Sequence, residues 1–464
     1  MNNNVNIGDY CETTRSVCPK CLKILDAEIV IRDRQVIMQK ECPSHGSFEI
    51  LLSSDADYYL KSLSYNKPGV SPLGRSAEIH QGCPLDCGLC PEHKQHTCLA
   101  LIEVTSQCNL NCPVCFADSQ PGFNLSVPQV ERMLDRFVEL EGNPEVIQFS
   151  GGEPTIHPDI LEFLLIAKQK NIHMIMLNTN GIRIAEDDRF LAGLADMKPT
   201  VYLQFDGFSE KAYKQLRGKN IKQVKLKALD RLAEANIDVV LVPTIGKGIN
   251  HDQIGDIVKF GINHSAVCGI AFQPLTFAGR LSDFDPLNRE TIPDIIHGIV
   301  QQTEGLLVES DFIPVPCCHP TCRSATYLYV DNGNITPLPR MLEVDEYLDY
   351  VSNRTMPYVS PKILKALEGL WSTSSVPGTP ITTARFRSAC CNLPFIGQVR
   401  HLKRHVFTIV IQDFGDPYTM DLNVLQKCCI GELIPDGRII PFCSYNSLGY
   451  RQKIRDMIST GKIK

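Results

Sequence analysis

The sequence has no apolar run approaching the roughly 18 residues that a transmembrane helix requires, so it predicts no membrane span. Positive charge is not in excess: the formal net charge is −6, which excludes a basic field over the whole chain for binding nucleic acid. The first ten residues are polar and rich in asparagine, and they lack the apolar centre of a secretion signal. We therefore expect a cytoplasmic protein without a nucleic-acid partner.

A disulfide framework is also not indicated, although the 464 residues include 20 cysteines. The hydrophobic share of 43% and the charged share of 21% are typical of a globular chain, and the length suits two or three domains. Without a secretion signal, cysteines clustered at ligand spacing favour metal or iron–sulfur sites in a reducing compartment. The clusters lie at residues 18–42, 83–98, 108–115, 317–322 and 428–443.

Short apolar runs alternate with amphipathic helical patterns between about residues 99 and 275. One helix is marked by a capping box from Ser126 to Gln129, with Pro128 in its first turn. Six β/α units in series predict a parallel sheet, in the form of a full barrel, an open partial barrel or a doubly wound sheet. The strands are expected at 99–105, 145–149, 172–177, 200–205, 239–244 and 268–274.

Three cysteines follow the first of these strands directly, as Cys108-x3-Cys112-x2-Cys115. Three thiolates in one loop can ligate only three irons of a [4Fe-4S] cluster, which leaves the fourth iron open to a substrate or cofactor. The loop lies at the carboxyl end of a strand, where α/β folds place their sites. The alternatives are three structural cysteines or a zinc knuckle.

The second expected strand ends in Ser-Gly-Gly-Glu-Pro. Gly151 and Gly152 would let the backbone approach a ligand closely, and Glu153 offers a carboxylate to an ammonium group. Taken alone, this stretch is equally consistent with an ordinary strand-to-helix turn.

Together, the cysteine loop and the Gly-Gly-Glu-Pro strand end resemble the radical SAM superfamily, whose enzymes use S-adenosylmethionine (SAM). The resemblance implies a catalytic [4Fe-4S] cluster on Cys108, Cys112 and Cys115, with the amino and carboxyl groups of SAM on the open iron. It also implies that residues 151–153 contact the SAM amino group. Among the folds left open above, it selects a partial (β/α)6 barrel.

Polar residues follow the later strands, where the resemblance implies contacts to SAM or substrate. On this basis Asn180 and Asp206 are expected to bind the cofactor. The sequence departs from the family at Val114, where an aromatic residue usually precedes the third cysteine; Phe116 follows that cysteine instead. The resemblance therefore supplies no aromatic partner for the adenine of SAM at position 114.

A further cysteine group, Cys83, Cys87, Cys90 and Cys98, precedes the first expected strand. Four thiolates within sixteen residues suffice for a complete auxiliary [4Fe-4S] cluster. Zinc is the alternative, because four cysteines at such a spacing do not choose the metal.

The amino-terminal group has the spacing Cys-x2-Cys followed by Cys-x2-His, on Cys18, Cys21, Cys42 and His45. This spacing, with short hairpin-like stretches between, suits one tetrahedral ion, either zinc or a rubredoxin-like iron. Cys11 is the alternative fourth ligand if His45 is a surface residue.

The last group joins two distant segments through a predicted hairpin. Pro-Asp-Gly at 435–437 predicts a turn that pairs Ile434 with Arg438, and counting back along the strands places Cys429 opposite Cys443. Directly opposed residues are about 5 Å apart, which suits two ligands of one cluster. We therefore favour Cys429 over its neighbour 428. The expected ligands of this second auxiliary [4Fe-4S] cluster are Cys317 (weakly favoured over Cys318), Cys322, Cys429 and Cys443, against the alternative of scattered buried cysteines.

The predicted organisation is an α/β protein in four parts. A small rubredoxin- or zinc-knuckle-like metal module spans 11–66, and an auxiliary iron–sulfur segment spans 75–98. The partial radical SAM barrel follows at 99–285. A carboxyl-terminal region with the second auxiliary site spans 286–464.

The cysteine motifs taken together resemble the tetraether lipid synthase group, part of which has been assigned as pterin methyltransferases. That resemblance covers nearly the whole chain. It implies cleavage of SAM to a 5′-deoxyadenosyl radical, abstraction of hydrogen from lipid chain ends, and carbon–carbon bond formation between them. The alternative is a radical SAM methyltransferase acting on a pterin-like or other small molecule, and a non-catalytic electron carrier is a distant third. The expected partners are SAM, a lipid substrate and a reductant protein such as a ferredoxin or flavodoxin, with contact to a membrane surface as a further expectation.

Overall fold

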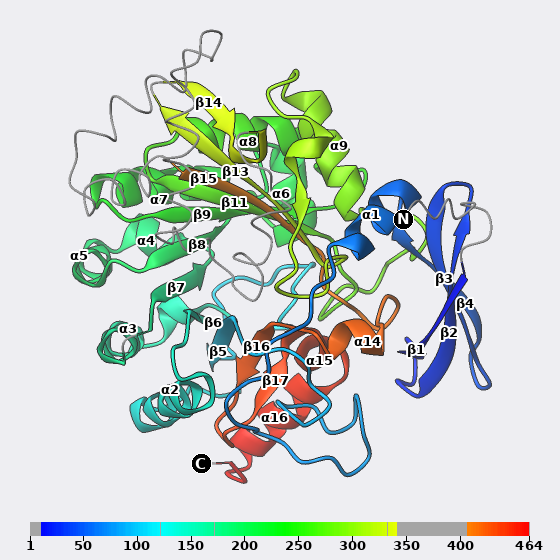
Figure 1. Ribbon diagram of the computed structural model, residues 1–464. Helices are drawn as coiled ribbons and strands as arrows, with labels where there is room; N and C mark the ends of the chain where they lie inside the picture. The colour runs from blue at the N-terminus through cyan, green and yellow to red at the C-terminus, as the bar shows by residue number, and fades with distance from the viewer. Residues whose placement is uncertain (1–10, 121, 171, 332, 341–405, 464) are drawn as a thin grey trace, which may run out of the picture.

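The computed structural model describes residues 11–120, 122–170, 172–331, 333–340 and 406–463 (Figure 1). Within these ranges the chain forms a small antiparallel sheet and a large sheet covered by helices. None of the helices that can be described has both the length and the apolar character needed to cross a membrane.

The small sheet is formed by the amino-terminal residues, coloured blue in Figure 1. Its four strands follow one another as an antiparallel meander, β1-β2-β3-β4. Burial alternates along the strands, so one face packs on a core while the other faces solvent. A short helix follows and is capped by Asp55, which accepts a hydrogen bond from the Tyr58 amide. The elements are β1 (Cys11–Val17), β2 (Ile24–Arg32), β3 (Gln35–Cys42), β4 (Gly46–Ser53) and α1 (Ala56–Ser64).

The centre of the large sheet consists of the six parallel strands that the sequence predicts, in sequential order. Their bounds agree with the expected ones to within two residues, and only the fifth is interrupted, by Pro243, before the short strand β10. The partial-barrel expectation is thus confirmed. The strands are β5 (Leu99–Thr105), β6 (Val146–Gly151), β7 (Met174–Thr179), β8 (Thr200–Gln204), β9 (Val239–Val242), β10 (Thr244–Ile245) and β11 (Val267–Pro274).

Helices connect these strands and cover the outer face of the sheet, as Figure 1 shows for α2, α3 and α5. The predicted capping box is present: Gln129 Oε1 accepts from the Ser126 amide at 2.8 Å. Between sheet and helices lies an apolar core. The helices are α2 (Val127–Glu141), α3 (Ile160–Gln169), α4 (Ile182–Glu186), α5 (Asp188–Met197), α6 (Glu210–Arg217), α7 (Lys222–Glu234), α8 (Ile254–Asn263) and α9 (Ile292–Gln302), with 3-10 turns η2 (Pro154–Ile156), η3 (His251–Gln253), η4 (Glu309–Asp311) and η5 (Leu338–Arg340).

Carboxyl-terminal strands extend the same sheet at both edges, which the sequence did not predict. β15 (Val406–Gln412) pairs in parallel with β11, and β16 (Ile430–Leu433) pairs in parallel with β5. The residues before and after the boundary expected at residue 285 therefore contribute strands to the same sheet. The domain limits themselves stay a prediction. The remaining elements are β12 (Ile313–Pro314), β13 (Arg323–Asp331), β14 (Asn334–Pro337), β17 (Ile439–Pro441), α14 (Leu422–Leu425), α15 (Phe442–Ser447) and α16 (Tyr450–Ser459).

Candidate active site and cysteine groups

The three-cysteine loop emerges from the carboxyl end of β5, where the resemblance expects it. Cys108, Cys112 and Cys115 are all half-buried. Burial, together with the negative charges of Glu153 and of the other two thiolates, raises the pKa of Cys108 to about 12. Bound metal ions stabilise thiolates that burial otherwise disfavours. Three partly buried thiols that sense one another's charge therefore fit a metal cluster.

The two glycines at the end of β6 pack closely against the end of β5, which leads into the cysteine loop. A Cβ on Gly151 would lie 2.3 Å from the Thr105 carbonyl oxygen, and one on Gly152 would lie 2.1 Å from that of Gln107. Both approaches exclude any side chain. In this structure the glycines permit the close packing of β6 against the end of β5, and their close approach to a ligand stays a prediction.

Glu153 lies beneath this junction and is almost completely buried. Its carboxylate accepts hydrogen bonds from the Asn180 amide at 2.7 Å, from the Thr179 hydroxyl at 2.6 Å, and from both the amide and the hydroxyl of Thr155. The contact between Glu153 and the SAM amino group stays a prediction. In this structure the bonds from Thr179 and Asn180 hold the end of β7, and the two from Thr155 hold the turn η2.

Asn180 connects the end of β7 to the cysteine loop, because its side-chain amide donates to Asn109 Oδ1 at 2.7 Å. Its carbonyl accepts from the ammonium of Lys225 at 2.5 Å, and Gln204 Oε1 accepts from the same group at 2.9 Å. Burial lowers the pKa of Lys225 to about 7. The sequence analysis missed Lys225, although its spacing from the buried Ala228, Leu229 and Leu232 places a charged residue on the apolar stripe of α7.

The carboxylate of Asp206 is bound by Arg217, and its expected contact with the cofactor stays a prediction. The guanidinium donates to the two carboxylate oxygens at 2.7 and 2.8 Å, and both residues are buried. The Thr244 amide donates to the same carboxylate at 3.1 Å. Arg217 also donates to the Val114 carbonyl at 3.3 Å, so this ion pair connects α6 and the strand ends to the cysteine loop.

A cavity of about 50 Å³ lies between the cysteine loop and the ends of the last barrel strands. Polar groups and aromatic rings share its wall. The lining residues include Phe116 and Phe414, whose rings are 5.6 Å apart, together with Arg217, Thr244 and Gln273.

The amino-terminal group comes together as the sequence predicts. The ligand atoms of Cys18, Cys21, Cys42 and His45 all lie within 4.8 Å of one another, at the β1–β2 and β3–β4 turns. The alternative ligand, Cys11, lies exposed at the start of β1.

Cys98 does not join Cys83, Cys87 and Cys90 as expected. Its sulfur lies 3.4 Å from that of Cys317, which in turn lies 3.2 Å from that of Cys429. The reason is the pairing of β16 with β5, in which the Cys98 amide donates to the Cys429 carbonyl at 2.9 Å. Cys98, Cys317 and Cys429 are all buried, and they form the second group of candidate metal ligands in the described part of the chain.

The predicted hairpin register is confirmed, but the conclusion about Cys443 is wrong. The Ile434 amide donates to the Arg438 carbonyl, and Gly431 pairs with Pro441. Beyond Pro441 the chain turns into α15, so Cys443 leaves the ladder before it can face Cys429. A hydrogen bond with the Cys443 thiol is the main cause that lowers the pKa of Cys428 to about 7.

The two residues of each cysteine doublet have different partners. Cys317 and Cys429 join Cys98, and Cys428 contacts Cys443. Cys318 contacts both Cys322 and Cys429. A cavity of about 110 Å³ is lined by Cys318, Cys322, Cys428, Cys429 and Cys443.

Comparisons with known proteins identify related families. A model of the radical SAM superfamily matches residues 102–261, and a model described as the HMPTM N-terminal zinc ribbon domain matches residues 10–54. The chain is 34% identical over 485 aligned positions to the 7,8-dihydro-6-hydroxymethylpterin dimethyltransferase of Methanocaldococcus jannaschii. That alignment covers 96% of this chain and 95% of the relative. The chain belongs to the radical SAM superfamily.

Other radical SAM relatives match only part of the chain. The GTP 3',8-cyclase of Chlorobaculum tepidum is 32% identical over 168 positions, which cover 35% of this chain and 49% of the cyclase. Among solved structures, Streptococcus suis SuiB bound to precursor peptide SuiA shares 46% of each chain, with 19% identity and a TM-score of 0.39.

Removing one ligand of the amino-terminal group tests whether this radical SAM protein uses it to hold an ion. We expect His45→Ala to lower the bound metal by about one ion per chain, because a tetrahedral site with three ligands holds zinc or iron poorly. Zinc and iron are measured on the purified protein by mass spectrometry. Cys11→Ala is the matched control and should retain the ion. Full metal content in the His45 variant with loss in the Cys11 variant would identify Cys11 as the ligand.

Proposed function

We propose that this radical SAM enzyme methylates a pterin-like ring. The observation that carries the proposal is the set of side chains beside the cysteine loop, where polar groups and the rings of Phe116 and Phe414 line one cavity. The cavity itself, about 50 Å³, would admit only one edge of the ring. A flat, polar heterocycle needs both hydrogen-bond partners and aromatic faces. The nearly full-length relative named as a pterin dimethyltransferase supports the same substrate class.

The residues around the cavity supply binding and orientation. A [4Fe-4S] cluster held by Cys108, Cys112 and Cys115 would supply the electron that cleaves SAM to methionine and a 5′-deoxyadenosyl radical, which would take a hydrogen atom from the reacting carbon. Because that methionine keeps its methyl group, a separate one-carbon donor would supply the methyl group that the ring receives. Asn180 holds the cysteine loop through Asn109, and Arg217 holds it through the Val114 carbonyl. Gln273 and Thr244 offer polar groups to the ring from the strand ends. The buried setting excludes water from a reactive radical.

The lipid-joining reaction expected from the sequence has weaker support. Two alkyl chain ends would require an apolar channel, whereas Arg217, Thr244 and Gln273 bring polar groups to the cavity wall. We therefore place the pterin substrate first.

The remaining cysteine groups are proposed as further metal sites. Cys18, Cys21, Cys42 and His45 would hold one zinc or iron ion. Cys98, Cys317 and Cys429 form the core of one auxiliary iron–sulfur site, in place of the grouping of Cys98 with Cys83, Cys87 and Cys90. A reductant protein such as a ferredoxin or flavodoxin would supply electrons.

Metabolite analysis of cells that express the chain tests the substrate. Pterin extracts should contain species that carry one or two added methyl groups, and these should be absent from cells that express Cys112→Ala. Mass spectrometry of the lipid fraction from the same cultures tests the alternative. Joined lipid chains together with unmodified pterins would overturn the proposal.

A further inference from the structure

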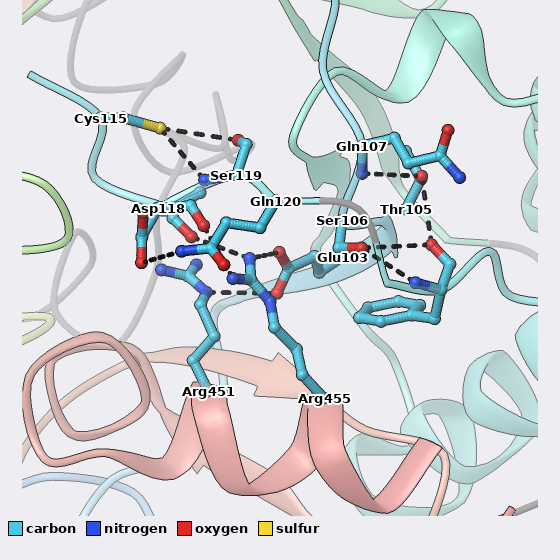
Figure 2. Close-up of polar contacts among 12 residues, drawn as sticks. Glu103, Thr105, Ser106, Gln107, Cys115, Asp118, Ser119, Gln120, Arg451 and Arg455 are labelled. Atoms are coloured by element: carbon cyan, nitrogen blue, oxygen red, sulfur yellow. Dashed lines mark hydrogen bonds and ion pairs between the residues drawn. The ribbon is translucent and has the colours of Figure 1, made fainter. Parts of the chain in front are cut away.

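The segment that follows Cys115 is held by arginines from the carboxyl-terminal helix α16. Figure 2 shows Arg451 and Arg455 extending from α16 toward this segment and toward Glu103 of β5. Arg451 donates to the Phe116 carbonyl at 3.0 Å. Arg455 donates to the carbonyls of Ala117 and Asp118, both at 2.8 Å. Three successive carbonyls after the third cysteine are thus hydrogen-bonded to two guanidinium groups.

Glu103 fixes both arginines. Its carboxylate accepts from Arg455 at 2.8 Å, from Arg451 at 3.2 Å, and from the Tyr445 hydroxyl at 2.8 Å. Burial alone would raise the pKa of Glu103, but the two guanidinium groups outweigh it and hold the pKa below its usual value. The carboxylate is therefore charged, and it neutralises one of the two positive charges.

The held segment turns back onto the sulfur of Cys115. Both the amide nitrogen and the hydroxyl oxygen of Ser119 lie 3.5 Å from Cys115 Sγ, as Figure 2 shows. Arg280 donates to the Ser119 carbonyl and so supports the same turn. Hydrogen bonds to cysteine sulfurs and nearby charges are among the factors that set iron–sulfur reduction potentials.

We propose that Arg451 and Arg455 are positioning residues that hold residues 116–118 so that Ser119 keeps its hydrogen bonds to Cys115, and that they thereby set the reduction potential of the SAM-binding cluster. The proposal relies on the cluster assignment of the cysteine loop and not on the pterin substrate. It also gives a role at the active site to α16, which lies more than 300 residues after Cys115 in the sequence.

The first measurement uses the full-length chain before iron–sulfur reconstitution. Arg455→Gln should increase the rate of alkylation at Cys115 several-fold, because the segment that covers its sulfur loosens, while Cys108 should react as in the unchanged protein. Site-resolved mass spectrometry gives both rates. The matched control is Arg231→Gln. Arg231 of α7 donates to the Ala185 carbonyl of α4 and pairs with Asp188 of α5, and neither partner is in the cysteine loop.

The second measurement is the midpoint potential of the reconstituted cluster, followed by electron paramagnetic resonance. Arg455→Gln should lower the potential, because a positive charge and the sulfur hydrogen bonds are lost together. Arg455→Lys retains the charge but not the paired carbonyl bonds, so it should restore the potential only in part and leave Cys115 reactive. If Arg455→Gln does not fold, Arg455→Lys takes its place. Alkylation and potential both unchanged in the folded variants would overturn the proposal.

Discussion

Replacing Cys112 with alanine is expected to abolish the formation of 5′-deoxyadenosine from SAM. The loop on Cys108, Cys112 and Cys115 supplies three thiolates, and the loss of one leaves too few ligands to hold a cluster with a single open iron. The measurement is 5′-deoxyadenosine in anaerobic assays of reconstituted, dithionite-reduced protein, with product quantified by chromatography.

The control for this prediction is Cys11→Ala. Cys11 is exposed at the start of β1 and belongs to neither of the candidate metal groups in the described residues. Its replacement should leave 5′-deoxyadenosine formation unchanged. Equal product from the Cys112 variant and the unchanged protein would show that this loop does not hold the catalytic cluster.

Local patterns predicted the barrel well because its strands and helices are defined by short-range signals. β5 spans the expected residues, and the capping box at Ser126 begins α2 as predicted. The amino-terminal group was equally accessible, since Cys18 and His45 are brought together by two neighbouring hairpin turns. In each case the contacts that decide the structure lie close together in sequence.

The cysteine groups that the sequence did not predict depend on pairing between residues far apart in the chain. Cys98 and Cys429 are 331 positions apart, and only the pairing of β16 with β5 brings them side by side. The hairpin register was correct, but no local signal marked the point at which the chain leaves β17 for α15, and this determines the position of Cys443.

Buried charge pairs limited the functional prediction in the same way. Asp206 occupies a strand end where the family resemblance suggests a cofactor contact, and nothing near it in sequence shows that Arg217 neutralises it. Likewise, no residue near Glu103 in the sequence indicates that two arginines from α16 bind its carboxylate. Such partners become visible only when the helices are placed against the sheet.

The second large effect is expected for Asp206→Ala, which removes one partner of a buried ion pair. Arg217 is only 8% exposed, and its charge would remain in the interior without a carboxylate. Breaking a buried pair in this way costs about 3–5 kcal/mol of unfolding free energy. Urea denaturation of the metal-free protein, followed by circular dichroism, measures the loss.

Asp188→Ala provides the matched comparison, because Asp188 also pairs with an arginine but its side chain is 94% exposed. Exposed pairs contribute little, so this variant should unfold at nearly the same urea concentration as the unchanged protein.

The conservative Asp206→Asn variant separates stability from cofactor binding, since it retains hydrogen-bonding capacity toward Arg217 but not the charge. If Asp206 instead bound SAM directly, Asp206→Asn would weaken SAM binding in equilibrium dialysis, and Asp206→Ala would unfold no more easily than Asp188→Ala.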